Sequence, residues 1–102
     1  MVKLVISRSA ALEISGIAQY LEHELASPDA ASSFIREFRN QAKLASSFPL
    51  SHPLCPHPEL AERGYRSFRV GRYIVIYSVA DDRLKILHVF HQSQDYVGDA
   101  LS

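Results

Sequence analysis

Side chains that could do acid–base or metal chemistry gather near the C-terminus, in the segment HVFHQSQDY at residues 88–96. His88 and His91 stand out, because a histidine can ligate a metal or exchange a proton near neutral pH. They lie three residues apart in a predicted strand, where an odd separation sends side chains to opposite faces. We therefore expect no shared metal or proton. His88 should share its face with Ile86, and His91, at the strand end, is the better candidate for a working side chain.

The densest positive charge lies in RGYRSFRVGRY, residues 63–73, where arginines recur at every third position with tyrosines between them. Interleaved Arg and Tyr side chains suit contact with phosphates and bases. In a strand, however, this spacing alternates between faces, so Arg66 and Arg69 should point to opposite sides. Two interpretations stay open: a functional contact surface, or a solvated hairpin at the edge of a sheet.

Two further groupings contain the right residue types for a metal or catalytic site but not the right spacing. His52, Cys55 and His57 lie close together, but prolines interleave them and no second cluster completes a zinc site. We expect a Pro-rich loop there, with no metal and no small-molecule cofactor. Ser93 lies close to His91, but the members of a catalytic triad usually come from separate elements.

A strand and two helices are predicted in the first half of the chain. Residues 2–7 are short and β-branched, and Ser9 is placed to cap the helix that follows. Apolar residues at helical spacing give that helix one face to bury: Ile14, Ile17, Ala18, Leu21 and Leu25. Ser27 as N-cap and Pro28 at the first helical position start a second amphipathic helix that runs to about Ser47.

The second half of the chain predicts a broken segment and then three strands. Residues 49–64 hold four of the five prolines, so this segment should be a loop or a broken turn. Three β-rich runs follow at residues 65–70, 72–79 and 83–91, and their short links favour an antiparallel meander. The prediction is an α+β fold of order β-α-α-β-β-β, with a two-helix antiparallel hairpin packed on one face of a small, mainly antiparallel sheet. The first strand should join at an edge, and the opposite face should be free.

Length and composition place the chain among soluble single-domain proteins. At 102 residues it is long enough for one core and too short for two, so residues 1–102 should form one domain. Eleven basic residues balance eleven acidic ones, which gives no bulk attraction to nucleic acid but leaves local patches open. A lone cysteine fits a reducing compartment, and no apolar run reaches the roughly 18 residues of a membrane helix. We expect a cytoplasmic protein that does not enter a membrane.

Three segments carry a family resemblance: ALEISGIAQYLEHELASPDAASSFIREFRNQAKLASSFP at residues 11–49, GYRSFRVGRYIVIYSV at 64–79 and LKILHVFHQSQD at 84–95. In order, and over nearly the whole chain, they resemble the RelE/ParE superfamily of toxins from type II toxin–antitoxin systems. The resemblance implies a cognate antitoxin protein as partner. We expect the antitoxin to contact the free face of the sheet and the outer grooves of the helix pair.

The superfamily resemblance leaves two activities open. RelE-like members cut messenger RNA on the ribosome, whereas ParE-like members poison DNA gyrase. RNA cleavage needs a base, an acid and cations for the developing phosphate charge, and here it would use Arg69 with His91 or Tyr96. Yet Ser93 and Gln94 occupy the place where RNA-cleaving relatives carry a late basic residue.

The favoured interpretation is a ParE-like toxin that binds gyrase with its cleaved DNA and does no chemistry of its own. The contact residues that this interpretation implies are Arg66, Arg69, Arg72, His91, Gln92 and Gln94. The alternative is an mRNA endoribonuclease that works with the ribosome. A third reading is a member that only binds its antitoxin or forms an oligomer.

Overall fold

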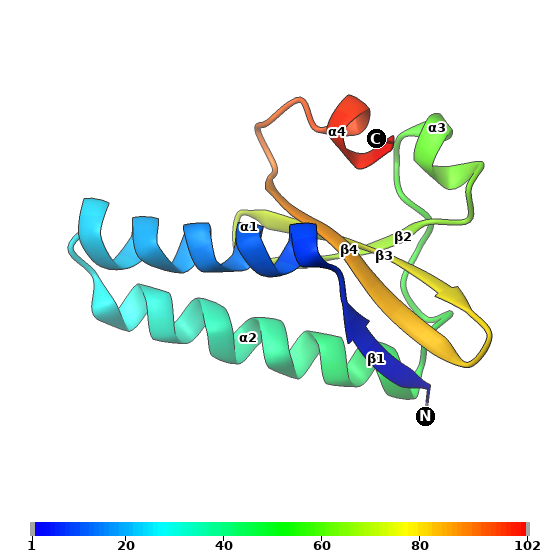
Figure 1. Ribbon diagram of the computed structural model, residues 1–102, viewed down its shortest axis with the longest axis horizontal. Helices are drawn as coiled ribbons and strands as arrows, with labels where there is room; N and C mark the ends of the chain where they lie inside the picture. Colours follow the sequence, from blue (N-terminus) through cyan, green and yellow to red (C-terminus); the bar gives the residue numbers. More distant parts are fainter. Residues whose placement is uncertain (1, 102) are drawn as a thin grey trace.

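The computed structural model describes residues 2–101. The elements follow in the order β1 (Lys3–Ile6), α1 (Arg8–Gln19), η1 (Tyr20–Glu24), α2 (Pro28–Ser47), α3 (Pro58–Ala61), β2 (Arg66–Val70), β3 (Tyr73–Ala80), β4 (Arg83–His91) and α4 (Val97–Leu101). The predicted α+β order is confirmed, with α3 and α4 as additional short helices (Figure 1). Among the described residues, no helix combines the length and the apolar character that a membrane crossing requires.

The strands form one sheet in the order β1-β4-β3-β2. β2, β3 and β4 are antiparallel neighbours, as their short links predict. β1 runs parallel to β4, with Leu4 beside Leu84, which confirms its predicted place at an edge. The link between β3 and β4 is a two-residue turn in which Asp81 and Asp82 have φ angles of 53° and 63°. Such left-handed pairs match the twist of a hairpin.

α2 begins and ends where the sequence predicts. The Ser27 side chain accepts a hydrogen bond from the Ala30 backbone N–H at 3.3 Å. Pro28 occupies the first helical position, where its missing N–H removes no intrahelical bond. The buried face consists of Ala31, Phe34, Phe38, Ala42, Ala45 and Ser46. α1 and α2 run antiparallel, as predicted, and both pack against the same face of the sheet (Figure 1).

The cap of α1 is Ser7 and not the predicted Ser9. The Ser7 hydroxyl accepts a hydrogen bond from the Ala10 N–H at 3.0 Å and donates one to the Leu87 carbonyl at 2.8 Å. β1 ends at Ile6, so Ser7 is the first residue free to adopt the extended cap conformation. Ser9 lies inside the first turn of the helix.

Replacing Ser7 by alanine removes both hydrogen bonds and leaves the Leu87 carbonyl without this donor. We expect the free energy of unfolding to fall by about 1–3 kcal/mol. Ser9→Ala is the matched control, because Ser9 is exposed, and its cost should stay within about 0.5 kcal/mol. Urea unfolding followed by circular dichroism measures both variants, and equal losses would contradict the assigned cap.

The first helix widens at its end into the π-helical turn η1. There the Leu25 N–H donates to the Tyr20 carbonyl at 3.2 Å, across five residues. The extra residue rotates the following side chains by roughly 100° about the helix axis. Leu25, predicted on the buried face, is therefore 54% exposed. Leu21, near the start of this turn, still packs against the core.

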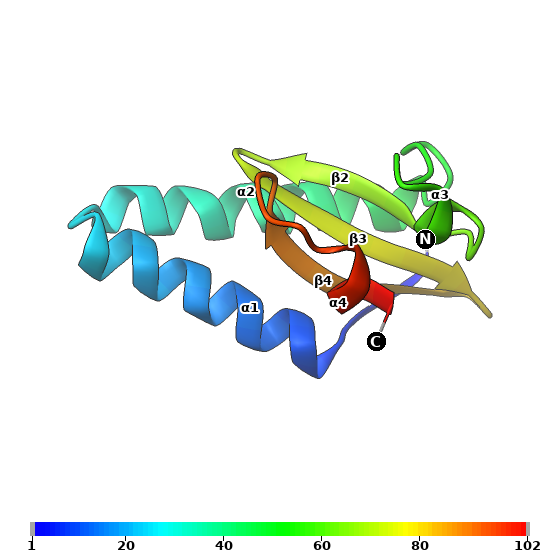
Figure 2. The ribbon, with the colours of Figure 1, turned by 90° about the horizontal axis from the view of Figure 1, so that it is seen from above.

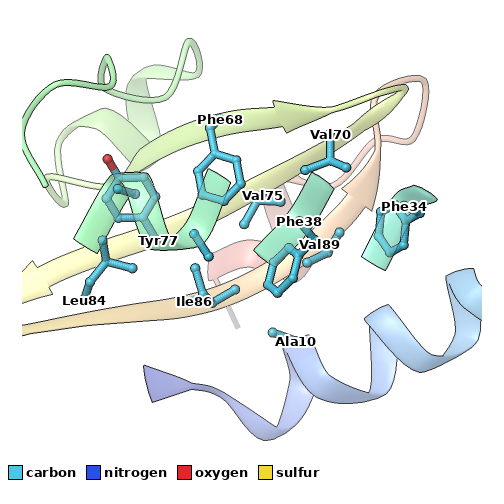
Figure 3. Close-up of a cluster of buried hydrophobic side chains, with 12 residues drawn as sticks. Ala10, Phe34, Phe38, Phe68, Val70, Val75, Tyr77, Leu84, Ile86 and Val89 are labelled. Atoms are coloured by element: carbon cyan, nitrogen blue, oxygen red, sulfur yellow. The ribbon is translucent and has the colours of Figure 1, made fainter. Parts of the chain in front are cut away.

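Two hydrophobic clusters lie on the two faces of the sheet. The first cluster lies between the helix pair and the sheet, where side chains of α2, β3 and β4 point toward one another (Figure 3). The second cluster, on the other face, consists of Cys55, Leu60, Ile74, Ile76, Phe90, Tyr96 and Ala100. The prediction that this face is free is therefore wrong over part of its area. Leu60 of α3 and Ala100 of α4 are buried against this face. The segments around them are rich in proline and polar residues.

β4 carries a bulge at Leu87, because the β3–β4 register passes over this residue. The residues on either side of the bulge, Ile86 and His88, therefore face opposite sides of the sheet. Ile86 belongs to the first cluster, whereas the His88 ring stacks on Phe90 of the second cluster with centroids 5.0 Å apart. The expectation that His88 shares a face with Ile86 is wrong. The separation of His88 from His91 is confirmed, since His91 lies on the face of the first cluster.

Candidate functional site

The end of β4 and the turn between β2 and β3 meet at one corner of the sheet. β4 ends at His91, and the Gln92 N–H donates to the Arg72 carbonyl at 2.8 Å. Gly71 supplies the left-handed residue of that turn, with φ of 58°. The Arg69 guanidinium donates to the Gln92 side-chain oxygen. Two segments that are distant in sequence are thus joined by main-chain and side-chain hydrogen bonds.

The predicted contact residues divide into a group of five and one outlier. The five lie together at this corner, and we call them the contact surface: Arg69, Arg72, His91, Gln92 and Gln94. Arg66 lies at the far end of β2, half-buried, and its guanidinium donates to the His52 carbonyl at 2.5 Å. Arg66 and Arg69 lie on opposite faces of the strand, as predicted. Arg66 therefore holds the Pro-rich loop in place through this hydrogen bond, and Arg66 does not belong to the contact surface.

The His91 ring is held by the turn that follows it. Its Nδ1 accepts a hydrogen bond from the Ser93 backbone N–H at 3.1 Å, and the Ser93 hydroxyl lies 2.7 Å from the same nitrogen. Because a backbone N–H can only donate, this geometry assigns the proton of the neutral ring to Nε2. The ring also packs edge-on against Tyr73, with centroids 5.3 Å apart. Ser93 and His91 thus meet in a turn that orients the ring and occupies its Nδ1.

Tyr96 lies in the second cluster, away from the exposed contact surface. It is 5% exposed, and its ring stacks on Phe90 with centroids 5.4 Å apart. His57 meets the same ring edge-on at 5.2 Å. Burial is the main cause that raises the pKa of the Tyr96 hydroxyl above its ordinary value. This tyrosine therefore packs the outer face of the sheet and keeps its proton.

Glu13 is the residue of this site that sequence reasoning missed. Its carboxylate accepts a hydrogen bond from the Val89 N–H at 2.9 Å and lies 3.1 Å from His88 Nδ1. β1 has four residues and β4 has nine, so the pairing with β1 stops at Ile86. Glu13 covers the β4 edge beyond that point and so positions the strand end that carries His91. The unequal lengths of the two strands were the signal available in the sequence.

The potential metal ligands of the Pro-rich loop do not converge. His52 packs on Phe68 of the first cluster, with ring centroids 5.4 Å apart. Cys55 is buried in the second cluster, where burial raises the pKa of its thiol, and His57 packs on Tyr96. Across the described chain, no three His, Cys, Asp or Glu side chains are grouped to hold a metal. The loop serves to pack both faces of the sheet.

A groove of about 1210 Å³ lies between the helix pair and the contact surface. Ile17, Leu21 and Phe34 contribute to its helical wall, and Tyr73 and Val89 to its sheet wall. Phe34 and Tyr73 meet edge-on, with ring centroids 5.2 Å apart. The walls are therefore largely apolar and joined by packed aromatic rings.

The groove shares residues with the contact surface. Arg72, His91 and Gln94 line its sheet side. On the helix side Tyr20 and Leu25 line it as well, and they are 47% and 54% exposed. An occupant of the groove would bury these apolar side chains and would touch the contact surface at the same time.

Comparison with known proteins identifies a family and a solved structure that this chain resembles. The sequence matches the family described as "ParE toxin of type II toxin-antitoxin system, parDE" over residues 4–96. Among solved structures, the fold is similar to one titled "Chromosomal ParDE TA system from P. aeruginosa", with a TM-score of 0.71, 18% identity, and coverage of 89% of this chain and 96% of that chain. No curated protein sequence matches. The chain belongs to the ParE toxin family of type II toxin–antitoxin systems.

Proposed function

We propose that this toxin acts in the cytoplasm by binding DNA gyrase with its cleaved DNA, and that it does no chemistry of its own. The observation that carries the proposal is the contact surface. It presents two exposed arginines, Arg69 and Arg72, beside the glutamine side chains of Gln92 and Gln94. Arginines and amides on an ordered turn suit recognition of a protein surface or a phosphate group.

The groups that RNA cleavage would need are poorly placed for it. His91 Nδ1 is occupied by Ser93 at 3.1 Å, and the Tyr96 hydroxyl is buried with a raised pKa. Ser93 and Gln94 add no cation to stabilise a developing phosphate charge. This arrangement supports binding without catalysis.

The cognate antitoxin is proposed to lie in the groove between the helix pair and the contact surface. An amphipathic helix with one apolar stripe would bury the side chains of Leu21, Leu25 and Tyr73. Arg72 and Gln94 line the groove and also belong to the contact surface. An antitoxin bound there would therefore cover part of the surface proposed for gyrase. This proposal differs from the expectation drawn from the sequence, which placed the antitoxin on the free face of the sheet and in the outer grooves of the helix pair.

A supercoiling assay with purified gyrase tests the proposal. The toxin should block supercoiling of relaxed plasmid, and treatment with detergent and protease should then release linear DNA. Addition of the antitoxin should restore supercoiling, and heat-unfolded toxin serves as the control. Unchanged supercoiling and no linear DNA at toxin excess would remove the proposal. New codon-positioned message ends after toxin induction, mapped by primer extension, would instead indicate RNA cleavage.

A further inference from the structure

The outer face of the sheet, which points away from α1 and α2, is covered over only part of its area. Ile74, Ile76 and Phe90 on this face lie in the second cluster with residues of α3 and α4. The tip of the β3–β4 hairpin extends past both short helices (Figure 2). Near that tip the outer face carries the side chains of Lys3, Val5, Ser78, Ala80, Arg83 and Lys85.

Alternation along the strands fixes the direction of the charged side chains in this region. Leu84 and Ile86 point into the first cluster, so Arg83 and Lys85 point to the outer face. Lys3 pairs with Arg83 in the parallel register, and paired residues share a face. We call Lys3, Arg83 and Lys85 the basic patch.

The basic patch brings three like charges together, and no described carboxylate forms an ion pair with them. Neighbouring strands lie about 4.8 Å apart, and alternate residues of one strand about 6.6 Å apart. All three side chains are exposed, and in the described part of the chain none of them makes an ion pair. Asp81 and Asp82 lie in the adjoining turn but do not pair with them either. Like charges side by side weaken a sheet, so an anionic partner would relieve a repulsion built into the fold.

We propose that the basic patch binds the phosphodiester backbone of double-stranded DNA. A protein interface needs apolar or aromatic anchors at its centre, whereas the larger apolar residues beside the patch, Val5 and Leu87, are both partly buried. Single-stranded nucleic acid is usually held by aromatic rings on which bases stack, and this part of the face has none. The side chains of Ser78 and Ala80 are small, so the DNA backbone can come close to the charged groups of the basic patch.

The basic patch and the contact surface are separate sites. Arg83 is the first residue of β4, and His91 is the last. The inference goes beyond gyrase binding, because its ligand is DNA alone. It can therefore hold or fail whatever the result of the supercoiling assay.

Fluorescence anisotropy with a labelled duplex of about 20 base pairs tests the inference on the full chain at about 50 mM salt and above. The test variant is Lys3→Gln/Arg83→Gln/Lys85→Gln, in which three exposed charges are lost. We expect binding about tenfold weaker or more, and a dependence of log K on log salt that is flatter by up to about 2.7, or about 0.9 per contact. Arg83→Gln alone should flatten it by about 0.9.

The matched control is Arg36→Gln/Arg39→Gln/Lys43→Gln, which removes the same net charge from exposed positions on α2. The control should bind the duplex nearly as tightly as the unchanged protein. Equal weakening in both triple variants would show an effect of net charge only and would overturn the inference. Tighter binding of a single-stranded RNA of equal length, or of a polyglutamate peptide, would overturn the assignment to duplex DNA. Circular dichroism should show all variants folded.

Discussion

The free energy of unfolding is expected to fall steeply above about pH 10, by up to about 4 kcal/mol per pH unit. The cause is burial, which raises the pKa of three tyrosines above 10.0: Tyr73, Tyr77 and Tyr96. In the unfolded chain these hydroxyls ionise near their ordinary value, while in the folded chain they keep their protons. The unfolded state then binds fewer protons, so the stability that is fully present below pH 10 is lost as the pH rises toward the folded pKa values. Cys55, raised from 9.0, adds a weaker onset from about pH 9.

Urea unfolding at a series of pH values between about 8 and 11 measures this loss. Tyr77→Phe removes one of the ionising groups and should flatten the slope by about 1.4 kcal/mol per pH unit. It also removes the 3.0 Å hydrogen bond to the Pro49 carbonyl, so it should cost about 1 kcal/mol at neutral pH. Ser9→Ala, at an exposed position, removes no ionising group and is the control that should leave the slope unchanged. A stability that does not change up to pH 11 would contradict the raised pKa values.

Local signals in the sequence were sufficient for the two long helices and for the antiparallel pairing of the last three strands. Ser27 and Pro28 start α2 where capping physics places the start, and the antiparallel meander follows from short links between β-rich runs. Strict alternation failed at Leu87, because a bulge depends on how two strands pair and not on the residues of one strand. The covered outer face was missed for a similar reason. Leu60 and Ala100 are single apolar residues in polar surroundings, and only the tertiary fold brings them together.

The sequence could single out residues of the candidate site one by one, but it could not show which of them meet. Arg69 and Gln92 were singled out separately, and the structure joins them through one hydrogen bond. Arg66 belongs to the same three-residue repeat of arginines as Arg69, but its guanidinium donates a hydrogen bond to the His52 carbonyl and so points away from the site. The role of Glu13 follows from a strand edge left open by a short partner, which periodicity along one element does not reveal.

Replacing Arg69 and Arg72 together by alanine is expected to raise the toxin concentration needed for half-inhibition of gyrase about 100-fold. This prediction rests on the proposed function. Interface arginines commonly cost more than about 1 kcal/mol each when truncated, and a combined loss of about 2.7 kcal/mol corresponds to the stated factor. Arg36→Ala/Arg39→Ala makes the same change in charge on α2 and should leave inhibition within about threefold. Equal losses in the two double variants would contradict a role for the contact surface.

The single variant Arg69→Ala separates gyrase binding from antitoxin binding. Arg69 belongs to the contact surface but does not line the groove, whereas Arg72 belongs to both. We therefore expect Arg69→Ala to weaken gyrase inhibition about tenfold and to leave antitoxin affinity unchanged, as measured by calorimetry. Arg72→Ala should weaken both. If Arg69→Ala instead lowered antitoxin affinity as much as inhibition, the antitoxin would have to cover the sheet corner itself, and the groove would not be its principal seat.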